Sequence, residues 1–510
     1  MSRRSLLVGA VATGLCLDAR AQAAAARPLR ISGSSGLVGF GGQTSSQLIQ
    51  NLEIAETLVR ADAAGRLLPG LAVRYSMTDD GGTYRFTIRA GARFHDGSPV
   101  SAQVVVDELM RIRTQVAAPL SRVPIQAIRA EGQDVTITLS KPFALLPAYL
   151  ATATSIILAP GSYGAGGTRH AVIGSGPYRL TAMRDPNNLE LRATDETIEH
   201  VIRDVRYLAV SDAETRARML EARNVDLIYN ISPAARERLR RNPSFRVVST
   251  TGPRIRYVML NMADPRLSDL SVRRALFLAM DRVGAARVLL RSPQAAAYQL
   301  MPPALADWTL PGEPLPPFNA TLANELLDQA GWKRAGAGGV RQKNGMRLAF
   351  TLQTYTMRPE LPSLAEALQA QWRRIGVEVR IAIVMPDRIV GDSRSGALEL
   401  ALVSRSYFVV PDVVGTLSED FDSASPARGW GAVGWTSAAV DEALRAYERS
   451  NDETVRRSSR ETILRALHAE LPVLPHSWYE FVLAHSAALT NVTYNPFETS
   501  FSISRMRWAA

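Results

Sequence analysis

The chain has 510 residues, a formal net charge of +11, 46% hydrophobic and 21% charged residues, and one cysteine. A chain of this length must fold around more than one packing unit, and its composition is ordinary for a globular protein. The positive charge is nearly all arginine, interleaved with acidic residues, and no basic run reaches five residues. The densest group, residues 236–241, is interpreted as one solvated helix face, so we expect no nucleic-acid partner.

Residues 1–26 have the layout of a secretory signal peptide. Arg3 and Arg4 form a positive start, an uncharged apolar run covers residues 6–17, and small residues suited to cleavage follow at 19–23. The run is too short to cross a bilayer as a helix. The paired arginines resemble a twin-arginine export box, with an ordinary secretory start as the alternative. We therefore expect a cleaved leader and a periplasmic product.

The single cysteine, Cys16, lies inside this predicted leader. Leu15 precedes it, where a lipoprotein signal would have a small residue, so we expect no lipid anchor. The mature chain then has no cysteine for disulfides, thiolate zinc sites or nucleophilic thiols. No later stretch approaches eighteen apolar residues, so we expect a chain that is not embedded in the membrane.

The first half of the chain predicts short strands, turns and one clear helix. Residues 28–31 form a strand that enters a glycine-rich stretch, 32–42, whose amides either lie against a ligand or belong to a flexible surface loop. Alternating side chains predict strands at 84–88 and 135–139, and apolar residues at helical spacing predict a helix at 101–113. Another strand follows Gly174 and ends before Pro186.

From about residue 200, strands alternate with helices. Short apolar strands are predicted at 226–229, 257–260 and 377–383. A helix is expected to start at Ser268 or Ser271, a second at Asn319 as its N-cap, and a third covers 364–375. This alternation predicts an α/β protein with mixed sheets.

Sequence motifs of common enzymes are missing. The chain has no phosphate-binding GxxxxGK[ST] loop, no GxGxxG after a strand, no GxSxG elbow and no HExxH. None of its six histidines are spaced four apart on one helix, and His476 and His485 could meet only through tertiary folding. We therefore expect no enzyme, no cofactor and no resident metal. A hydrolase remains the alternative, because catalytic triads are assembled in three dimensions.

Five segments of the mature chain follow one known order and spacing. They are residues 84–102 with a Phe-His-Asp-Gly turn, 174–178, 260–282, 323–332 and 467–475. Together they resemble the family 5 extracellular solute-binding proteins, the peptide, nickel and opine receptors of ABC importers. The tail from 475 to 507 is most similar to the nickel and metallophore receptors of that family.

The chain departs from those nickel receptors where ligand contacts are expected. Tyr407 replaces their tryptophan and Pro411 their tyrosine, and no histidine occurs in residues 415–435. No arginine lies in 150–158, where one would bind a carboxylate. The resemblance therefore implies solute capture and leaves the solute open between a small peptide, a chelated metal and an opine-like molecule.

The resemblance implies a bilobed periplasmic-binding-protein fold of the cluster C type, with mixed sheets, two large lobes and a smaller domain. The ligand would be enclosed between the lobes, and crossing strands would form the hinge. We expect a monomer whose partners are the ligand and the permease subunits of an ABC transporter. The implied division is lobe I at 27–50, 175–258 and 476–510, a small domain II at 51–174, and lobe II at 259–475.

Candidate ligand contacts are polar and aromatic residues that the resemblance places near the cleft. Arginine binds carboxylates through two parallel hydrogen bonds, and aromatic faces bury area at low entropic cost. A peptide would use Asp412 for its amine, whereas a metal would favour His476 or His485. The alternative is that the tryptophans are core residues and the helix-end arginines are solvated. The candidates are Arg405, Tyr407, Asp412, Trp430, His476, Trp478, Tyr479, Arg111 and Arg113.

Overall fold

The computed structural model describes residues 27–509, apart from 39–41, 63–64, 80, 116–117, 196, 199–200, 337 and 426–428. The predicted leader and part of the glycine-rich stretch therefore lie outside the described residues. Within the described part, no helix is both long enough and apolar enough to cross a membrane.

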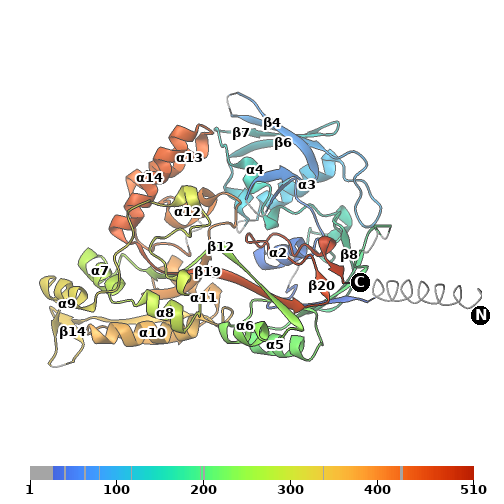
Figure 1. Cartoon of the computed structure of the whole chain (residues 1–510). Helices are drawn as coiled ribbons and strands as arrows, with labels where there is room; N and C mark the ends of the chain where they lie inside the picture. The colour runs from blue at the N-terminus through green and yellow to red at the C-terminus, as the bar shows by residue number, and fades with distance from the viewer. Residues whose placement is uncertain are drawn as a thin grey trace, which may run out of the picture.

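One ten-stranded mixed sheet runs through the molecule (Figure 1). Its two longest strands, β12 (Phe245–Leu260) and β19 (Val473–Ser486), lie side by side at its centre and are antiparallel. We call the half on the β19 side lobe I and the half on the β12 side lobe II. Lobe I holds β11 (Leu227–Tyr229), β1 (Leu29–Gly33), β10 (Asp204–Ala209), β9 (Asn188–Ala193) and β8 (Tyr178–Asp185), and lobe II holds β18 (Leu400–Ser406), β16 (Ala349–Thr354) and β17 (Glu378–Ile383).

Helices cover both faces of this sheet. In lobe I, α5 (Ala213–Glu221) and α6 (Pro233–Arg240) bury an apolar cluster against β11, β12 and β19, and α2 (Gln43–Asn51) belongs to the core on the other face. The helices of lobe II are α7 (Leu270–Leu278), α8 (Arg282–Val288), α9 (Ala320–Gln329), α10 (Leu361–Arg374), α11 (Pro386–Ser395), α12 (Val413–Phe421), α13 (Ala438–Arg449) and α14 (Glu453–Glu470).

A separate four-stranded antiparallel sheet lies beside the lobes, with α3 (Ala102–Arg113) packed on it (Figure 1). The strand order is β4 (Ala72–Met77), β5 (Thr83–Ile88), β7 (Asp134–Leu139) and β6 (Ile125–Glu131). Its apolar core continues into lobe II, whereas lobe I has a core of its own. The implied boundaries at 50, 174, 258 and 475 stay a prediction.

Most predicted elements form because their local signals are strong. Ser101 caps α3 by accepting a hydrogen bond from the Val104 amide, and Asn319 caps α9 in the same way from Leu322. The strands predicted at 84–88, 135–139 and 377–383 are confirmed within one or two residues. The start predicted for α7 at Ser268 or Ser271 is wrong, because Asp269 is the N-cap and accepts from the Ser271 amide.

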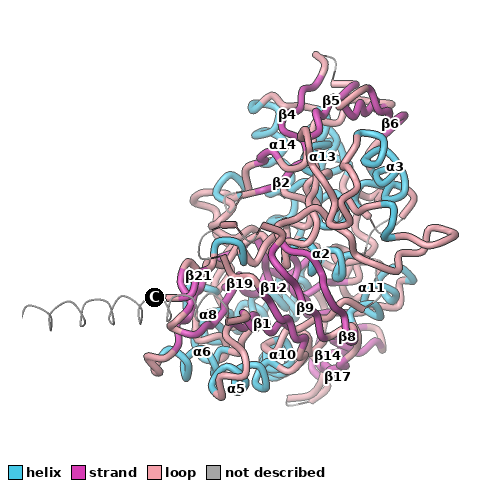
Figure 2. Tube along the Cα trace, turned by 90° about the vertical axis from the view of Figure 1, so that its right-hand side faces the viewer, coloured by secondary structure: helices cyan, strands magenta, loops and turns pink. Residues whose placement is uncertain are grey.

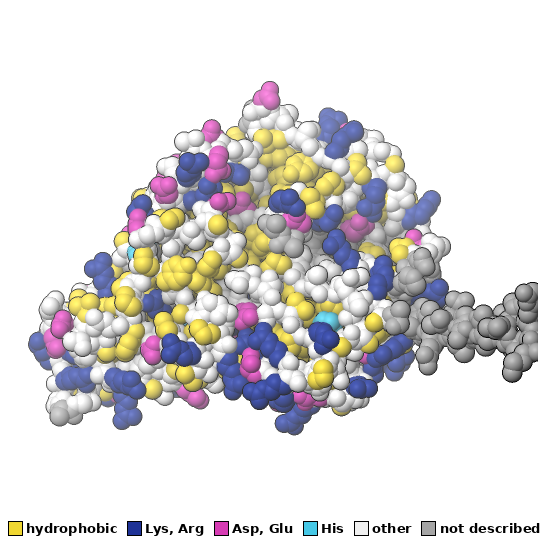
Figure 3. Space-filling model, in the orientation of Figure 1, with side chains coloured by type: hydrophobic (Ala, Val, Ile, Leu, Met, Phe, Trp, Pro, Cys, Tyr) yellow, Lys and Arg dark blue, Asp and Glu magenta, His cyan; other side chains and the backbone are white. Residues whose placement is uncertain are grey.

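The interpretation of residues 236–241 as a solvated face is also wrong at one position. Basic side chains do gather over α5 and α6 (Figure 3). The side chain of Arg236, however, is only 4% exposed and donates to the Glu480 carboxylate at 2.7 Å and to the Leu290 and Arg291 carbonyls. Arg236 therefore joins α6 to β19 and to the segment that follows α8 through buried hydrogen bonds.

Another backbone segment passes very close to both glycines of the segment Gly174-Ser175-Gly176-Pro177-Tyr178. A β-carbon on Gly174 would lie 2.0 Å from the Ile54 carbonyl oxygen, and one on Gly176 would lie 2.1 Å from that of Glu53. The Gly176 amide donates to the Ile54 carbonyl at 3.0 Å, which fixes the approach. Tyr178, fully buried, then starts β8 with its hydroxyl on the Ile202 carbonyl.

We predict that Gly174→Ala destabilises the protein by about 1–3 kcal/mol, because the obstructing atom is backbone and cannot rotate away. The free energy of unfolding in urea measures this. Gly391→Ala is the matched control: Gly391 lies in α11 with no heavy atom within 4 Å of a new β-carbon, so it should be neutral or stabilising. Equal losses at both sites would contradict the steric explanation.

Candidate functional site

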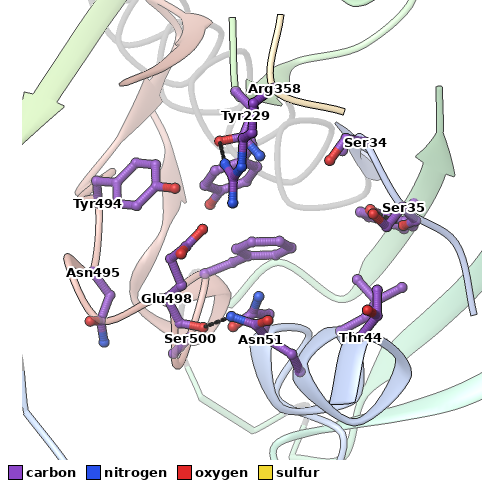
Figure 4. A pocket seen from close by; sticks show the side chains of 16 residues that line it. Ser34, Ser35, Thr44, Asn51, Tyr229, Arg358, Tyr494, Asn495, Glu498 and Ser500 are labelled. Carbon is purple, nitrogen blue, oxygen red and sulfur yellow. Dashed lines mark hydrogen bonds between the residues drawn. The ribbon is translucent and has the colours of Figure 1, made fainter. Parts of the chain in front are cut away.

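A pocket of about 120 Å³ opens between lobe I and one arginine of lobe II (Figure 4). Arg358, in the loop between β16 and α10, is the lobe II residue; the other lining residues come from lobe I. The pocket combines hydroxyls, side-chain amides and tyrosines with one carboxylate. Its lining is Gly33, Ser34, Ser35, Thr44, Gln47, Leu48, Asn51, Tyr207, Tyr229, Asn230, Arg358, Tyr494, Asn495, Glu498, Ser500 and Phe501.

A second cavity of about 50 Å³ adjoins the first and shares Gln47 and Glu498 with it. Its other walls come from residues 151–154 and from the loop after β18, including Phe408 and Pro411. The two cavities together form a cleft, and we use that name for them below. The glycine-rich stretch predicted to meet either ligand or solvent borders this cleft through Gly33, Ser34 and Ser35.

The cleft lies at the carboxyl ends of strands that have parallel neighbours. β1 is parallel to β10 and β11, and β16 is parallel to β17 and β18. Ser34 follows β1, Asn230 follows β11 and Arg358 comes four residues after β16. Ligand sites in α/β sheets form in such crevices, where neighbouring connections leave in opposite directions.

Three arginines surround the ring of Tyr479 beneath the cleft. The guanidinium carbons of Arg256, Arg358 and Arg254 lie 4.1, 5.3 and 5.8 Å from the ring centroid. Arg256 pairs with Glu360 at 2.8 Å, and Arg254 pairs with Glu498.

Arg358 differs from the other two because it forms no ion pair with a carboxylate of the described residues. Within that part of the chain, its side chain donates to the Asn230 side-chain oxygen at 3.5 Å and to the Tyr479 hydroxyl at 3.3 Å. Both distances are long for an arginine contact. Of these three guanidiniums, two are paired with carboxylates and that of Arg358 is not.

Arg358, Glu360 and Glu498 are ionised at neutral pH. Burial alone would raise the pKa of Glu498, but Arg254 and Arg358 lower it below its ordinary value; Arg256 does the same for Glu360. Burial opposes the charge of Arg358, but the Tyr479 oxygen and the Glu498 carboxylate outweigh it and raise the pKa of Arg358. The positive charge is therefore permanent.

Several buried polar atoms at the cleft lack a hydrogen-bond partner among the described residues. They are the side-chain oxygen of Asn51, the hydroxyl of Tyr229 and Nε of Arg254. An unpaired buried polar group costs about 1–3 kcal/mol. Their grouping around one pocket indicates a place where a ligand supplies the missing partners.

The C-terminal loop that carries Glu498 is held in a strained shape. Glu498 and Ser502 both adopt left-handed backbone angles, with φ of 53° and 58°, which non-glycine residues rarely do. Glu53 fixes the loop by accepting from the Ser500 hydroxyl at 2.8 Å and the Ser504 amide at 2.9 Å. Gln47 of α2 donates to the Glu498 carbonyl. This strain presents the Glu498 carboxylate to Arg254.

One aromatic pair joins the two lobes across the cleft. Phe408 of lobe II stacks on Phe497 of the C-terminal loop with 3.7 Å between ring centroids. Gly65, in the loop between β2 (Val59–Ala61) and β3 (Leu67–Pro69), closes over both rings: a β-carbon there would lie 2.7 Å from Phe408 and 3.2 Å from Phe497. We call Phe408, Phe497 and Gly65 the clasp.

Of the nine candidate residues, Tyr479 has its ring against two lining residues of the cleft, Arg254 and Arg358. Tyr407 and Asp412 are sequence neighbours of the lining residues Phe408 and Pro411. Trp478, the neighbour of Tyr479, is 4% exposed, donates to the Gln299 carbonyl at 3.2 Å and packs edge-on against Tyr298. None of the nine lines the cleft itself.

The candidates near residue 405 are placed inside lobe II. Arg405 is 7% exposed and makes two 2.8 Å hydrogen bonds with Asp420. Burial lowers its pKa, but that carboxylate and Glu419 outweigh burial, and the pKa of Arg405 is raised. Tyr407 is fully buried beside it.

Asp412 and Trp430 have structural contacts of their own. Asp412 is the N-cap of α12, accepting from the Val414 amide at 2.9 Å. Trp430 is half-buried, and its carbonyl accepts from the Tyr257 hydroxyl.

Arg111 and Arg113 lie at the end of α3, away from the cleft lining. Arg111 pairs with Glu108 at 3.1 Å and covers the ring of Tyr163 at 3.9 Å. Arg113 donates to the Ile125 carbonyl. Both guanidiniums are therefore engaged within the four-stranded sheet and its connections.

Sequence reasoning missed Arg358, Glu498, Asn51 and Tyr229. No motif marks them, and they come from four separate segments. One signal was available: the chain after β1, β11 and β16 leaves the carboxyl ends of short apolar strands, which is where polar ligand contacts gather. That rule finds Ser34, Asn230 and Arg358 but not the C-terminal loop.

His476 and His485 do not form a metal site. They lie nine residues apart on the same strand, β19, which places them about 30 Å apart. His476 is 1% exposed; burial, followed by Arg256 and Arg282, lowers its pKa to about 3. Among the described residues, no group of three or more His, Cys, Asp or Glu side chains is placed to hold a metal ion.

We predict that His476 makes the fold acid-sensitive. The buried imidazole stays neutral to about pH 3, whereas in the unfolded chain it gains a proton near pH 6.5. The unfolded state thus binds more protons between these values, and stability falls as the pH is lowered through them. Between pH 7 and 4.5 this amounts to about 2–3 kcal/mol.

Chemical denaturation at both pH values tests this. His476→Gln should lose less stability on acidification than the native chain, by about the same 2–3 kcal/mol. The exposed His170→Gln serves as the control and should behave like the native chain. Parallel pH profiles for native protein and His476→Gln would contradict the assignment.

The chain matches the model of the bacterial extracellular solute-binding proteins, family 5 Middle, over residues 66–425. It is 24% identical over 486 residues to the nickel-binding periplasmic protein of Escherichia coli K12, covering 91% of each chain. NikA from Brucella suis in complex with Fe(III)-EDTA has a TM-score of 0.83, with 24% identity over 94% of this chain and 100% of that one.

The oligopeptide-binding protein AppA of Bacillus subtilis, in complex with a nonapeptide, has a TM-score of 0.81, with 20% identity over 95% of this chain and 99% of that one. These likenesses confirm the predicted fold class, two lobes with mixed sheets and a smaller domain. The family match covers well over half of the sequence, so the chain belongs to the bacterial extracellular solute-binding proteins of family 5.

Proposed function

We propose that this chain is the solute-binding component of an ABC importer and captures a small solute bearing a carboxylate in the cleft. In this proposal the leader is cleaved on export to the periplasm, and the mature, monomeric protein hands its solute to the permease. The observation that carries the choice of solute is Arg358, a permanent cation at the cleft that forms no ion pair with a carboxylate of the described residues.

The rest of the cleft supports a polar organic solute. Tyr229 and Phe501 stack at 4.1 Å and form an aromatic wall, while hydroxyls and amides of Ser34, Thr44 and Asn51 supply hydrogen bonds. A short peptide, an opine-like molecule and a metal chelated by carboxylates all combine these features. A metal would arrive already chelated, because the described residues offer no ligand cluster for the bare ion.

The lining of the cleft does not favour the hydrolase alternative. General base catalysis needs a group whose proton-accepting atom faces the substrate. The one carboxylate in the lining belongs to Glu498, which is paired with Arg254 and has a lowered pKa. A strong ion pair of this kind makes a poor base, so we propose binding without chemistry.

Capture and release require the lobes to move apart. The clasp is suited to hold the closed form, because Phe408 and Phe497 come from different lobes and would separate on opening. Gly65 adds a third contact from the loop beside them. Closing would remove water from Arg358 and strengthen its interaction with the solute carboxylate.

We predict that Arg358→Met weakens binding of a carboxylate solute about 10- to 100-fold, since a charged hydrogen bond is worth about 1.5–3 kcal/mol. Dipeptides identified by a thermal-shift screen would be titrated calorimetrically, each as the free acid and as the C-terminal amide. The native protein should prefer the acid, and the variant should lose that preference.

Arg111→Met is the matched control, because that arginine is engaged with Glu108 and Tyr163 outside the cleft. Native mass spectrometry of protein from its own host adds an independent readout. The native chain should carry a copurified acidic mass and Arg358→Met should not. Equal affinities of native and Arg358→Met protein for the acid would contradict the proposal.

We predict that Phe408→Ala favours the open form. Removing one ring of the stacked pair forfeits about 0.5–1.5 kcal/mol beyond the lost contact area. Ligand dissociation should become several-fold faster, and small-angle scattering should give a larger radius of gyration for the unliganded chain. The exposed Phe318→Ala, at 42% exposure, should change neither quantity. An unchanged dissociation rate in Phe408→Ala would show that the clasp does not hold the lobes.

A further inference from the structure

A cavity of about 270 Å³, larger than either cavity of the cleft, lies on lobe I. Its lining residues come from β1, β9, β10, the end of α5 and Arg184 of the outer strand β8. Figure 2 shows β1, β9 and β8 in this part of the sheet. Side chains alternate along these strands. Leu29 and Ile31 of β1 are buried in the core, so Arg30 between them projects to the opposite face.

Two arginines stand directly opposite each other on that face. The parallel pairing of β1 and β10 sets Arg30 against Arg206. Like charges at opposed positions destabilise a sheet. Arg30 is neutralised by Asp226, through contacts of 2.8 and 2.9 Å. Among the described residues, no carboxylate pairs with Arg206 in this way.

Arg206 has a carboxylate beside it but does not bind it. Glu190 of β9 is its partner in the ladder, yet the Glu190 carboxylate pairs with Arg184 at 2.7 Å. The exposed side chain of Arg206 makes no hydrogen bond or ion pair with any residue that the structure describes. Its guanidinium thus forms no ion pair, whereas Arg184 pairs with Glu190, and Arg30 shares Asp226 with Arg27.

The floor of the cavity is formed by the apolar side chains of Leu208, Met219 and Val225. Asn188 and Asn224 line the cavity as well, whereas the side chains of Ile31 and Leu189 point into the core on the other face of the sheet. An unpaired cation above an apolar floor matches a ligand with an anionic head and an apolar body. Such a ligand places its head on Arg206 and buries its body against the floor.

We propose that this cavity, which we call the lobe I cavity, is a second ligand site that binds a small amphipathic organic anion through Arg206. The proposal does not rest on the cleft, since the two sites share no charged residue. The same chemistry occurs in a free aliphatic acid and in an anionic lipid, and the experiment separates these sources.

The test is calorimetric titration of the mature chain with octanoate, octan-1-ol and inorganic phosphate. Octanoate should bind with a stoichiometry of one, and both octanol, which lacks the charge, and phosphate, which lacks the apolar body, should bind at least about ten-fold more weakly. Arg206→Met should weaken octanoate binding about ten-fold or more. Unchanged octanoate affinity in Arg206→Met would overturn the proposal.

Two controls locate the binding site. Arg358→Met should bind octanoate as the native chain does; a loss there and not in Arg206→Met would mean that the probe occupies the cleft, and the proposal would fail. In ¹³C-methyl methionine spectra, octanoate should shift Met219, which lines the lobe I cavity, and leave the exposed lobe II residue Met385 in place. An unshifted Met219 would also overturn it.

Sedimentation with phosphatidylglycerol vesicles distinguishes the source of the anion. Arg206-dependent binding of octanoate without vesicle binding supports a free acid. Arg206-dependent binding to vesicles supports a lipid as the source of the same head and body. If neither octanoate nor vesicles bind in a way that depends on Arg206, the site does not exist.

Discussion

The pairing of β12 with β19 is the constraint on which the site depends. The ladder is regular from Phe245 to Thr251 and resumes only at Ile255. Gly252 and Pro253 fall in the break: a β-carbon on Gly252 would lie 1.9 Å from the Phe481 ring, and proline has no amide to give to a ladder. Such irregularities change the direction in which the following side chains point. Here the break directs Arg254 to Glu498, and a second register shift follows Arg256.

The charges around Tyr479 explain why the cleft needs no arginine between residues 150 and 158, where one was expected. Residues 151–154 do border the cleft, but only with small and hydroxyl side chains. In the proposed site the cation is Arg358 of lobe II. Arg254 and Arg256 are already neutralised by Glu498 and Glu360, so a solute meets one available charge and not three. A single available cation suits a solute with one carboxylate. Closing the lobes would exclude water from this pair of charges and so strengthen their attraction.

Local sequence signals predicted the helices and strands, whereas contacts between residues far apart in sequence determine which side chains form the candidate site. Ser101 and Asn319 act as N-caps because a cap needs only the next three residues. Arg405 could not be assigned in this way, since its pairing with Asp420 depends on how α12 folds back onto β18. Glu498 could not be predicted for the same reason. It belongs to a loop without a periodic pattern, and its position depends on Glu53 and Gln47, more than 440 residues away in sequence. The family resemblance correctly identified the fold, whereas none of the nine candidate positions taken from it lines the cleft, and their role in binding stays a prediction.

The two proposed sites lie on opposite faces of the lobe I sheet, because successive side chains along a strand point to opposite faces. In β10, Tyr207 faces the cleft while Arg206 faces the lobe I cavity. Tyr207 borders both, but it is 3% exposed and its hydroxyl donates to the Ser35 carbonyl at 2.7 Å. Energetic coupling between sites requires an element with two arrangements that each ligand biases differently. A side chain packed and hydrogen-bonded in this way offers one arrangement only. Occupancy of the lobe I cavity should therefore leave the affinity of the cleft unchanged, and the two sites act on the same lobe independently.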